Sequence, residues 1–429
     1  MSVVPDKRES PRPDLLALRP PTTGPAPIGR LVRTHRRRGV ATQLRAGELA
    51  ALPGITSLLS TWVIFQLLDH HHRFLTAVNL SNMVMQIAAV GIIAVGITLV
   101  LLLGEIDLSI GSVSGLAAAT LAILVIRHGV PEVGAIGLVV LLGLGVGIVQ
   151  GMIHAAIGVP SFVVTLAGLI GWQGLHLYLL GPQSTINVSD HGIIAILTHA
   201  YLPAVAGWSL GAVMVGSYLA AVVVDVRRRR AAGLPGLARW RRAVRLVLLS
   251  AGVGLTVGVL NSWRGIPVAL AMVVAFAVGA DVMLRRTRFG RSIIAIGGNV
   301  EAARRAGIPV NRIRITVFAL GSAMAAIGGI LAVSREFAAN QSTGGSDVLL
   351  FAIAAAVIGG VSLFGGRGST YGALLGIAVI GSINNGMYLL ELDSSVRFMI
   401  TAAVLLMAVI IDSLSRRDHQ LPAGTSHRL

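Results

Sequence analysis

The sequence predicts an all-α polytopic membrane protein, with about twelve transmembrane or half-membrane helices and both termini in the cytoplasm. Its 429 residues are 54% hydrophobic and only 12% charged, and the mean hydropathy is +0.80. Soluble domains usually carry about 25% charged residues. The charges crowd into a few segments and leave apolar runs of around twenty residues, each long enough to cross about 30 Å of hydrocarbon.

The apolar runs place the helices in order along the chain. We predict them at 51–68, 83–103, 108–126, 133–156, 161–180, 203–225, 243–260, 266–284, 315–333, 346–361, 371–390 and 396–412. Alternation across the membrane then puts the arginine-rich segments on one side, at 227–245, 285–314, 367 and 416–417. The segment 181–202, which holds no Lys or Arg, falls on the other side. This asymmetry follows the positive-inside rule, so the basic side is cytoplasmic.

The chain divides into three regions. Residues 1–48 are rich in proline and arginine, and we expect a disordered basic cytoplasmic tail, because such a composition buries too little apolar surface to fold. Residues 49–415 form the predicted membrane domain, with basic cytoplasmic loops at 226–245 and 285–314. Residues 416–429 are expected to be a short cytoplasmic tail.

The loop 285–314 carries eight arginines and contains a short predicted helix. Asn299 can cap its start. Ala302 and Ala303 favour the helical conformation, and Gly307 ends it. Two interpretations remain open at this point: a solvated linker helix, or a small-residue helix that another protein grips.

A second polar segment interrupts the apolar pattern between two predicted helices. It contains Glu105, Asp107, Ser109 and Gly111. We favour Asp107 as the cap of the following helix, supported by Ser109, because no histidine or arginine partner lies near in sequence. The alternative is an ion or proton site. His154, at the end of another predicted helix, is interpreted as interfacial rather than as part of a proton relay.

Neutral polar side chains within the predicted helices are candidates for a solute pathway. They are Gln86, Gln150, Thr165, Gln173, Asn384 and Asn385. Amides and hydroxyls suit a polyhydroxylated solute, which needs many weak donors and acceptors and no counter-ion. The alternative is that they join helices by interhelical hydrogen bonds.

Several classes of function lack the residues that they need. A phosphate-binding P-loop requires a lysine in a glycine frame, and Lys7, the one lysine, lies in the tail. There is no histidine–carboxylate metal pattern, no nucleophile elbow and no cysteine, so we expect no cofactor and no enzyme activity. The net charge is +17, and the arginines lie in loops beside predicted spans. Contact with anionic lipid headgroups therefore explains this charge better than binding of nucleic acid. These residues indicate a solute-moving membrane subunit whose energy source lies elsewhere.

Four segments resemble the permease subunits of ribose/xylose-type sugar ABC importers. They are EIDLSIGS at 105–112, VPSFVVTLAGL at 159–169, TRFGRSIIAIGGNVEAARRAGI at 287–308 and VIGGVSL at 357–363. The resemblance runs from about residue 79 to residue 412. The extra length between 181 and 268 is similar to that of the D-xylose permeases within the family.

The resemblance implies a type II-like importer permease in a bacterial plasma membrane. Two permease copies would form the pathway, a double-cassette ATPase would dock below, and an extracytoplasmic sugar-binding protein would deliver a monosaccharide, D-xylose first among the candidates. Asn299, Glu301, Ala302, Ala303 and Gly307 would belong to the segment that couples to the ATPase. Permeases for ribose, galactose or several sugars, and an ion-coupled secondary transporter, remain alternatives.

Overall fold

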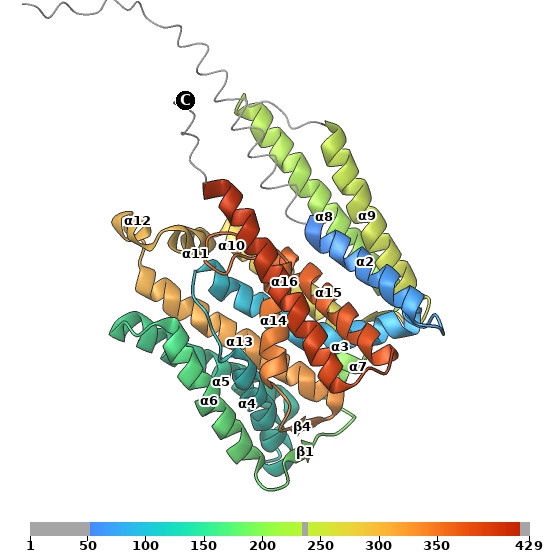
Figure 1. Cartoon of the computed structure of the whole chain (residues 1–429), viewed down its shortest axis with the longest axis vertical. Helices are drawn as coiled ribbons and strands as arrows, with labels where there is room; N and C mark the ends of the chain where they lie inside the picture. Colours follow the sequence, from blue (N-terminus) through green and yellow to red (C-terminus); the bar gives the residue numbers. More distant parts are fainter. Residues whose placement is uncertain (1–51, 234–238, 421–429) are drawn as a thin grey trace, which may run out of the picture. The chain divides into compact units, whose positions relative to one another are not determined.

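A computed structural model describes residues 52–233 and 239–420 as helices joined by short segments (Figure 1). Within this part, nine helical segments are long and apolar enough to cross a membrane. They are formed by α3 (Ala77–Leu102), α4 (Ile110–Ala122) with the π-helix η1 (Ile123–Arg127), α5 (Glu132–Met152) with the π-helix η2 (Ile153–Ile157), α6 (Ser161–Leu180), α8 (Ala204–Ala231), α9 (Arg239–Asn261), α10 (Val268–Arg286), α13 (Val310–Glu336) and α15 (Thr370–Leu389).

Three of the predicted spans form helices with shorter apolar stretches. They are α2 (Leu52–Leu68), α14 (Ser346–Ile358) and α16 (Ser394–Gln420). Each of the twelve predicted segments therefore coincides with a helix, and nine of them have spanning length within the described residues. Three further short helices, α7 (Ile193–His199), α11 (Arg288–Gly298) and α12 (Val300–Arg305), lie between the spans.

The two long basic loops that we predicted contain more helix than expected. Helix α8 continues to Ala231 and α9 begins at Arg239, so most of the segment 226–245 is helical. Likewise α11, α12 and the start of α13 occupy most of 285–314, where one short helix was expected. Runs of arginine keep good helix propensity, so the hydropathy pattern marked the end of the apolar surface rather than the end of the helix. The predicted N-terminal tail lies outside the described residues.

Helix α13 lies at the centre of the bundle, packed against α3, α4 and α5 (Figure 1). Glycines bring these helices close together. Gly147 of α5 lies against the carbonyl group of Phe318, and Gly329 lies against the carbonyl group of Ser114. Small residues allow such close backbone approach, which is how helices in lipid gain van der Waals contact.

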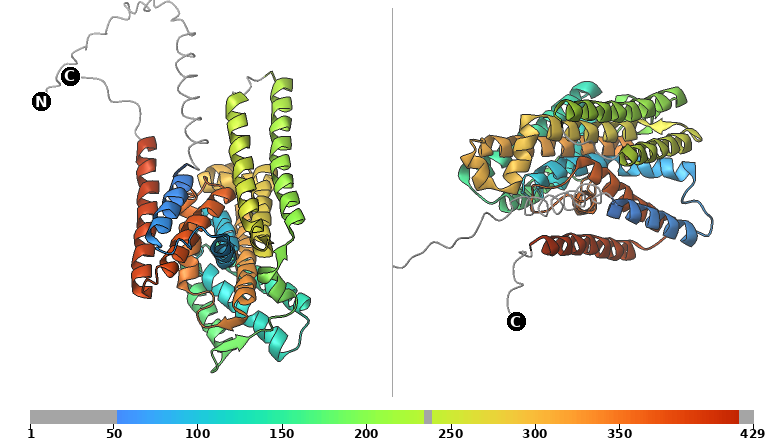
Figure 2. Two further views of the ribbon diagram at one scale, coloured as in Figure 1. Left: turned by 90° about the vertical axis from the view of Figure 1, so that its right-hand side faces the viewer. Right: turned by 90° about the horizontal axis from the view of Figure 1, so that it is seen from above.

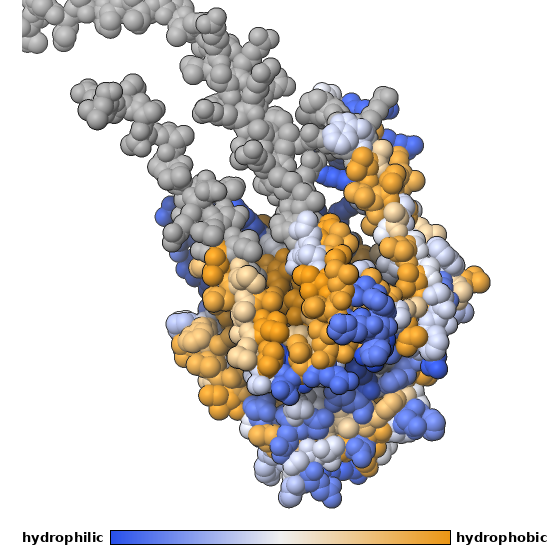
Figure 3. Space-filling model, turned by 45° about the vertical axis from the view of Figure 1, so that its right-hand side comes forward, coloured by the Kyte–Doolittle hydropathy of each residue, from blue (hydrophilic) through white to orange (hydrophobic). Residues whose placement is uncertain are grey.

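Helices α8 and α9 form a hairpin (Figure 2). Few of its side chains are buried within the protein. They pack chiefly on each other, and α9 also touches α3. Broad apolar areas cover the face of the protein seen in Figure 3, as expected for helices that contact lipid. The hairpin and the central helices therefore differ in what surrounds them, although both are apolar.

Short strands and loop contacts agree with the predicted alternation across the membrane. Strand β1 (Thr185–Asn187) pairs with β4 (Ala338–Asn340), and β2 (Tyr201–Leu202) pairs with β3 (Ile266–Pro267), both antiparallel. All four strands lie in segments that the alternation assigns to the side opposite the arginines. The connections that it assigns to the arginine side also contact one another, as described below.

Candidate functional site

Helix α12 begins and ends where the sequence predicts. The side chain of Asn299 accepts a hydrogen bond from the backbone N–H of Ala302 at 2.9 Å, which makes Asn299 the N-cap. Gly307 has a φ of +77°, a left-handed conformation that glycine adopts without steric cost. The short helix is therefore specified locally, by its cap and by its terminating glycine.

One face of α12 is exposed and the other holds it to the bundle. Glu301, Ala302 and Gly307 are exposed, whereas Ala303 is only 4% exposed and packs within the main hydrophobic core. Figure 1 shows α12 and α11 at the edge of the bundle, beside one end of α13. The exposed surface of α12 therefore combines small residues with charged ones, since Arg304 and Arg305 are exposed as well.

Glycine contacts connect this region with two other connections between helices. The N–H of Gly366, between α14 and α15, donates to the carbonyl oxygen of Leu102 at the end of α3 at 2.9 Å. Gly297, in the last turn of α11, lies against that same carbonyl group, and a methyl group there would be 2.6 Å from Gly366 N. Residues larger than glycine do not fit at position 297 without moving backbone.

The segment between α3 and α4 turns back into the bundle before α4 begins. Gly111, in the first turn of α4, lies near the carbonyl oxygen of Gly345, and a methyl group there would be 3.2 Å from it. Gly345 belongs to the loop between β4 and α14, which the alternation assigns to the opposite side of the membrane. Helix α14 has 13 residues, whereas the 13 residues of α4 continue through η1 as one helical segment of 18 residues.

Asp107 acts at the start of α4, though not in the manner of an ordinary cap. Its Oδ1 accepts hydrogen bonds from the backbone N–H of Ser109 at 2.9 Å and from the Ser109 hydroxyl at 2.6 Å. No N–H within α4 donates to it, so the predicted capping role is replaced by fixing Ser109, the residue before the helix. Burial raises the pKa of Asp107, against these two hydrogen bonds, which lower it.

Glu105 has partners that the local sequence did not indicate. Its Oε1 lies 2.7 Å from Nη2 of Arg314 on α13 and 3.1 Å from Nε2 of His154 in η2. Nδ1 of His154 lies 2.8 Å from the carbonyl oxygen of Val159, which fixes the ring. The side chains of Glu105, His154 and Arg314 are 11%, 8% and 16% exposed. We call these three residues the buried ion cluster.

The electrostatics of the buried ion cluster favour an ionised Glu105. Burial raises the pKa of its carboxyl group. Hydrogen bonds with His154 and Ser161 lower it, as do the charges of His154 and Arg314, and the net result is a pKa below the ordinary value. The ring of His154 is buried against Glu105 and Phe318, contacts that the sequence did not indicate, and its interpretation as interfacial stays a prediction. These partners are 49 and 209 residues away in sequence, beyond the reach of a local pattern.

Two of the pathway candidates contact the segment between α3 and α4. Oε1 of Gln150 lies 3.0 Å from the Ser109 hydroxyl, whose one proton is nearer to Asp107. The hydroxyl of Thr165 lies 3.2 Å from the carbonyl oxygen of Ile106 and 2.9 Å from that of Ser161 in its own helix. Both side chains are buried, and a role in a solute pathway stays a prediction for both residues.

The other pathway candidates lie elsewhere in the bundle. Asn385 exchanges hydrogen bonds with Asn79 of α3, at 2.8 and 3.1 Å between their amide groups. Gln86 on α3, Gln173 on α6 and Asn384 on α15 are half-buried. The structure therefore groups Gln150 with Thr165 and leaves the other candidates apart from them.

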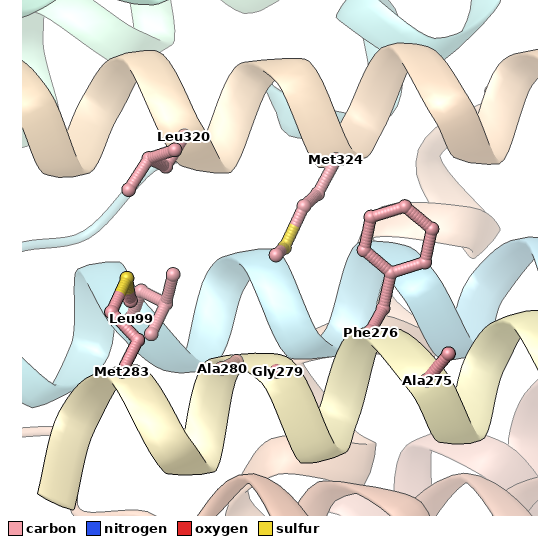
Figure 4. A pocket seen from close by; sticks show the side chains of 8 residues that line it. All are labelled: Leu99, Ala275, Phe276, Gly279, Ala280, Met283, Leu320 and Met324. Carbon is pink, nitrogen blue, oxygen red and sulfur yellow. The ribbon is translucent and has the colours of Figure 1, made fainter. Parts of the chain in front are cut away.

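A pocket of about 300 Å³ lies between α3, α10 and α13 (Figure 4). Apolar side chains surround it, among them Leu99, Phe276, Met283 and Met324. A sugar would leave its hydroxyl groups without partners there, at a high free-energy cost. The pocket is therefore no candidate for the sugar pathway.

The bundle of helices of spanning length defines a multi-pass membrane protein. The chain belongs to the family described as "Branched-chain amino acid transport system / permease component", whose model matches residues 79–410. This confirms the resemblance to ABC importer permeases that the four sequence segments carry. The subunit is a permease component and not an enzyme.

Curated relatives match most of their own length and most of this chain. The xylose transport system permease protein XylH of Escherichia coli K12 is 38% identical over 345 residues, covering 80% of this chain and 87% of the relative. XylH of Haemophilus influenzae is 34% identical over 344 residues, covering 80% and 91%. The ribose import permease protein RbsC of E. coli K12 is 33% identical over 342 residues, covering 80% and 87%. No solved structure gives a significant match.

Proposed function

We propose that this chain is the transmembrane subunit of an ATP-driven importer that takes up a monosaccharide, with D-xylose as the first substrate to test. The identity to the xylose permeases, 38% and 34%, against 33% to the ribose permease, supports this order. Ribose, galactose and a mixture of sugars are the alternatives within the class. An ion-coupled secondary transporter is the alternative outside it.

The exposed face of α12 supports a docking role for a cytoplasmic ATPase subunit. Glu301, Ala302 and Gly307 offer small and polar groups to a partner, while buried Ala303 fixes the helix to the bundle. A double-cassette ATPase below, a second permease copy beside it and a sugar-binding protein above would complete the importer. The exposed arginines of the α8–α9 hairpin suit anionic lipid headgroups.

In such an importer, nucleotide binding changes the ATPase, and the ATPase moves α12. The movement can switch the access of the pathway only if ATP and the loaded binding protein bind one conformation more tightly than the other. The permease contributes no chemistry to this cycle. The permease would form the pathway and change conformation when the ATPase moves α12.

Uptake by reconstituted vesicles tests the proposed transport function. The permease is placed in liposomes with its ATPase subunit and binding protein, and the accumulation of labelled D-xylose is measured with competing D-ribose or D-galactose. We expect uptake to require ATP and to continue after an ionophore has collapsed the ion gradients. Uptake by the permease alone, driven by an ion gradient, would establish the secondary transporter instead.

Thiol labelling tests the docking role of α12, because the chain contains no cysteine. The variant Ala302→Cys places a thiol on the exposed face, and Ala232→Cys, after α8, serves as an exposed control. We expect the ATPase subunit to slow maleimide labelling at position 302 by at least about tenfold and to leave position 232 unchanged. Equal labelling of both variants with and without the ATPase would remove the docking assignment.

A further inference from the structure

The buried ion cluster joins the ATPase-facing region to the rest of the bundle. Arg314 lies just over one turn into α13, and α12 ends at Arg305. Hydrogen bonds continue through the short connection, from Ile308 N to the carbonyl oxygen of Ala303 at 3.1 Å and from Val310 N to that of Ile308 at 2.8 Å. These hydrogen bonds would therefore transmit a displacement of α12 directly to the first turns of α13.

On the other side of the cluster, Glu105 belongs to the segment that turns back into the bundle. Its backbone N–H donates to the carbonyl oxygen of Val100 at 3.2 Å, which ties it to the end of α3. Two and four residues later, Asp107 and Ser109 set the start of helix α4. Through Ser109 this segment also contacts Gln150 on α5. Movement of Glu105 would thus act on three helices, α3, α4 and α5.

Five other ion pairs of the described residues are local. Arg73 with Asp69, Arg229 with Asp225, Arg285 with Asp281, Arg304 with Glu301 and His191 with Asp190 are separated by at most four residues in sequence. Each stays within one local stretch and moves with it. The contacts of Glu105 with Arg314 and His154, by contrast, join elements that are far apart in sequence.

We propose that Glu105 and Arg314 are positioning residues that pass the movement of α12 to the α3–α4 segment, and so couple ATP hydrolysis to the switch of the pathway. This rests on the docking role proposed for α12. The side chains of Arg314 and Glu105 are only 16% and 11% exposed, so separation would leave each charge without its partner in a poorly solvated place.

His154 holds the carboxylate in place for Arg314. The π-helical turn η2 carries its ring, and the contact of Nδ1 with the carbonyl oxygen of Val159 directs Nε2 at Glu105. Nε of Arg314 is buried without a partner in the described residues, so the guanidinium is held mainly by Glu105. The cluster therefore depends on one carboxylate shared by two nitrogen groups.

The test compares transport with ATP hydrolysis in the complete importer reconstituted in liposomes. The variants are Glu105→Gln, Arg314→Gln and the charge-preserving Arg314→Lys. We expect the first two to lower sugar transported per ATP hydrolysed by about tenfold, within the 5- to 150-fold range of typical coupling between sites. ATP hydrolysis should stay within about twofold of the wild type, and Arg314→Lys should restore most of the ratio. Arg229→Gln, which breaks a local pair in α8, is the matched control and should leave the ratio unchanged.

A second variant covers the case in which a single change prevents folding. Glu105→Gln combined with Arg314→Met removes both charges of the Glu105–Arg314 pair, and such double replacements are often neutral for stability. We expect this variant to fold, to support ATP hydrolysis and to transport poorly. A wild-type ratio of transport to hydrolysis in the double variant would overturn the proposal, whereas absence of ATP-driven sugar uptake in the wild type would overturn the proposed function.

Discussion

Helices α13 and α8 are nearly equal in length and hydropathy, yet they lie in very different surroundings. Helix α13 has 27 residues with a hydropathy of 2.0, and α8 has 28 residues with a hydropathy of 1.8. The structure buries 67% of the apolar window of α13 and only 6% of that of α8. Hydropathy therefore specifies that a helix spans the membrane, but it does not specify whether lipid or protein surrounds that helix.

Small residues explain much of the difference. A methyl group on Gly329 of α13 would collide with the carbonyl group of Ser114, and one on Gly321 would lie 3.1 Å from Val100. Gly216 of α8 has nothing within 4 Å of the same position. Glycine in α13 permits close contact with a neighbouring helix, whereas Gly216 meets no neighbour at all.

The largest loss of stability is expected from a substitution where α13 packs most closely on α4. Gly329→Leu forces the backbones of α13 and α4 apart and should lower the free energy of unfolding by at least about 3 kcal/mol, because overpacking against backbone cannot be relieved by a rotamer change. Gly216→Leu is the matched variant and should change stability by less than about 0.5 kcal/mol. Thermal unfolding of the two purified variants in detergent measures the difference. Equal stability of the two variants would contradict close backbone contact between α13 and α4.

The same contrast holds for ion pairs. The side chains of Arg314 and Glu105 are 16% and 11% exposed, whereas those of Arg229 and Asp225 in the hairpin are 37% and 48% exposed. Removing one partner of a buried pair typically costs about 3–5 kcal/mol, while exposed pairs contribute about 0–1 kcal/mol. Water screens the second pair and cannot replace the partner lost from the first.

A smaller effect is expected in the pH dependence of stability, where the partly buried Glu105 and an exposed carboxylate should differ. Because the pKa of Glu105 is lowered in the folded protein, its contribution to stability is present above the unfolded value of about 4.3 and is lost as the pH falls through the folded value. The stability gap between the wild type and Glu105→Gln should therefore shrink on acidification below about pH 4.3. Unfolding followed from pH 7 to pH 3 measures it.

The control for this measurement is Asp225→Asn in the exposed hairpin pair. We expect this variant to follow the wild type at each pH, since solvent screens the carboxylate that it removes. A gap for Glu105→Gln that stays constant as the pH falls would contradict an ionised, paired Glu105 in the folded protein.

The sequence predicted those parts of the fold and the site that depend on neighbouring residues. Each predicted apolar run coincides with a helix, since about twenty apolar residues in a row suffice to favour a span. Asn299 and Gly307 were sufficient to place the ends of α12, because capping acts over three or four residues. The extension of α8 to Ala231 was missed, since charged residues end an apolar run without ending a helix.

The tertiary structure alone decided which distant groups meet. Glu105 faces His154 and Arg314, and Asn79 faces Asn385 across 306 residues of sequence. It also decided that α13 is surrounded by protein and α8 largely is not. Hydropathy, capping and turn preferences are summed over adjacent residues, whereas burial and ion pairing depend on which surfaces the folded chain brings together.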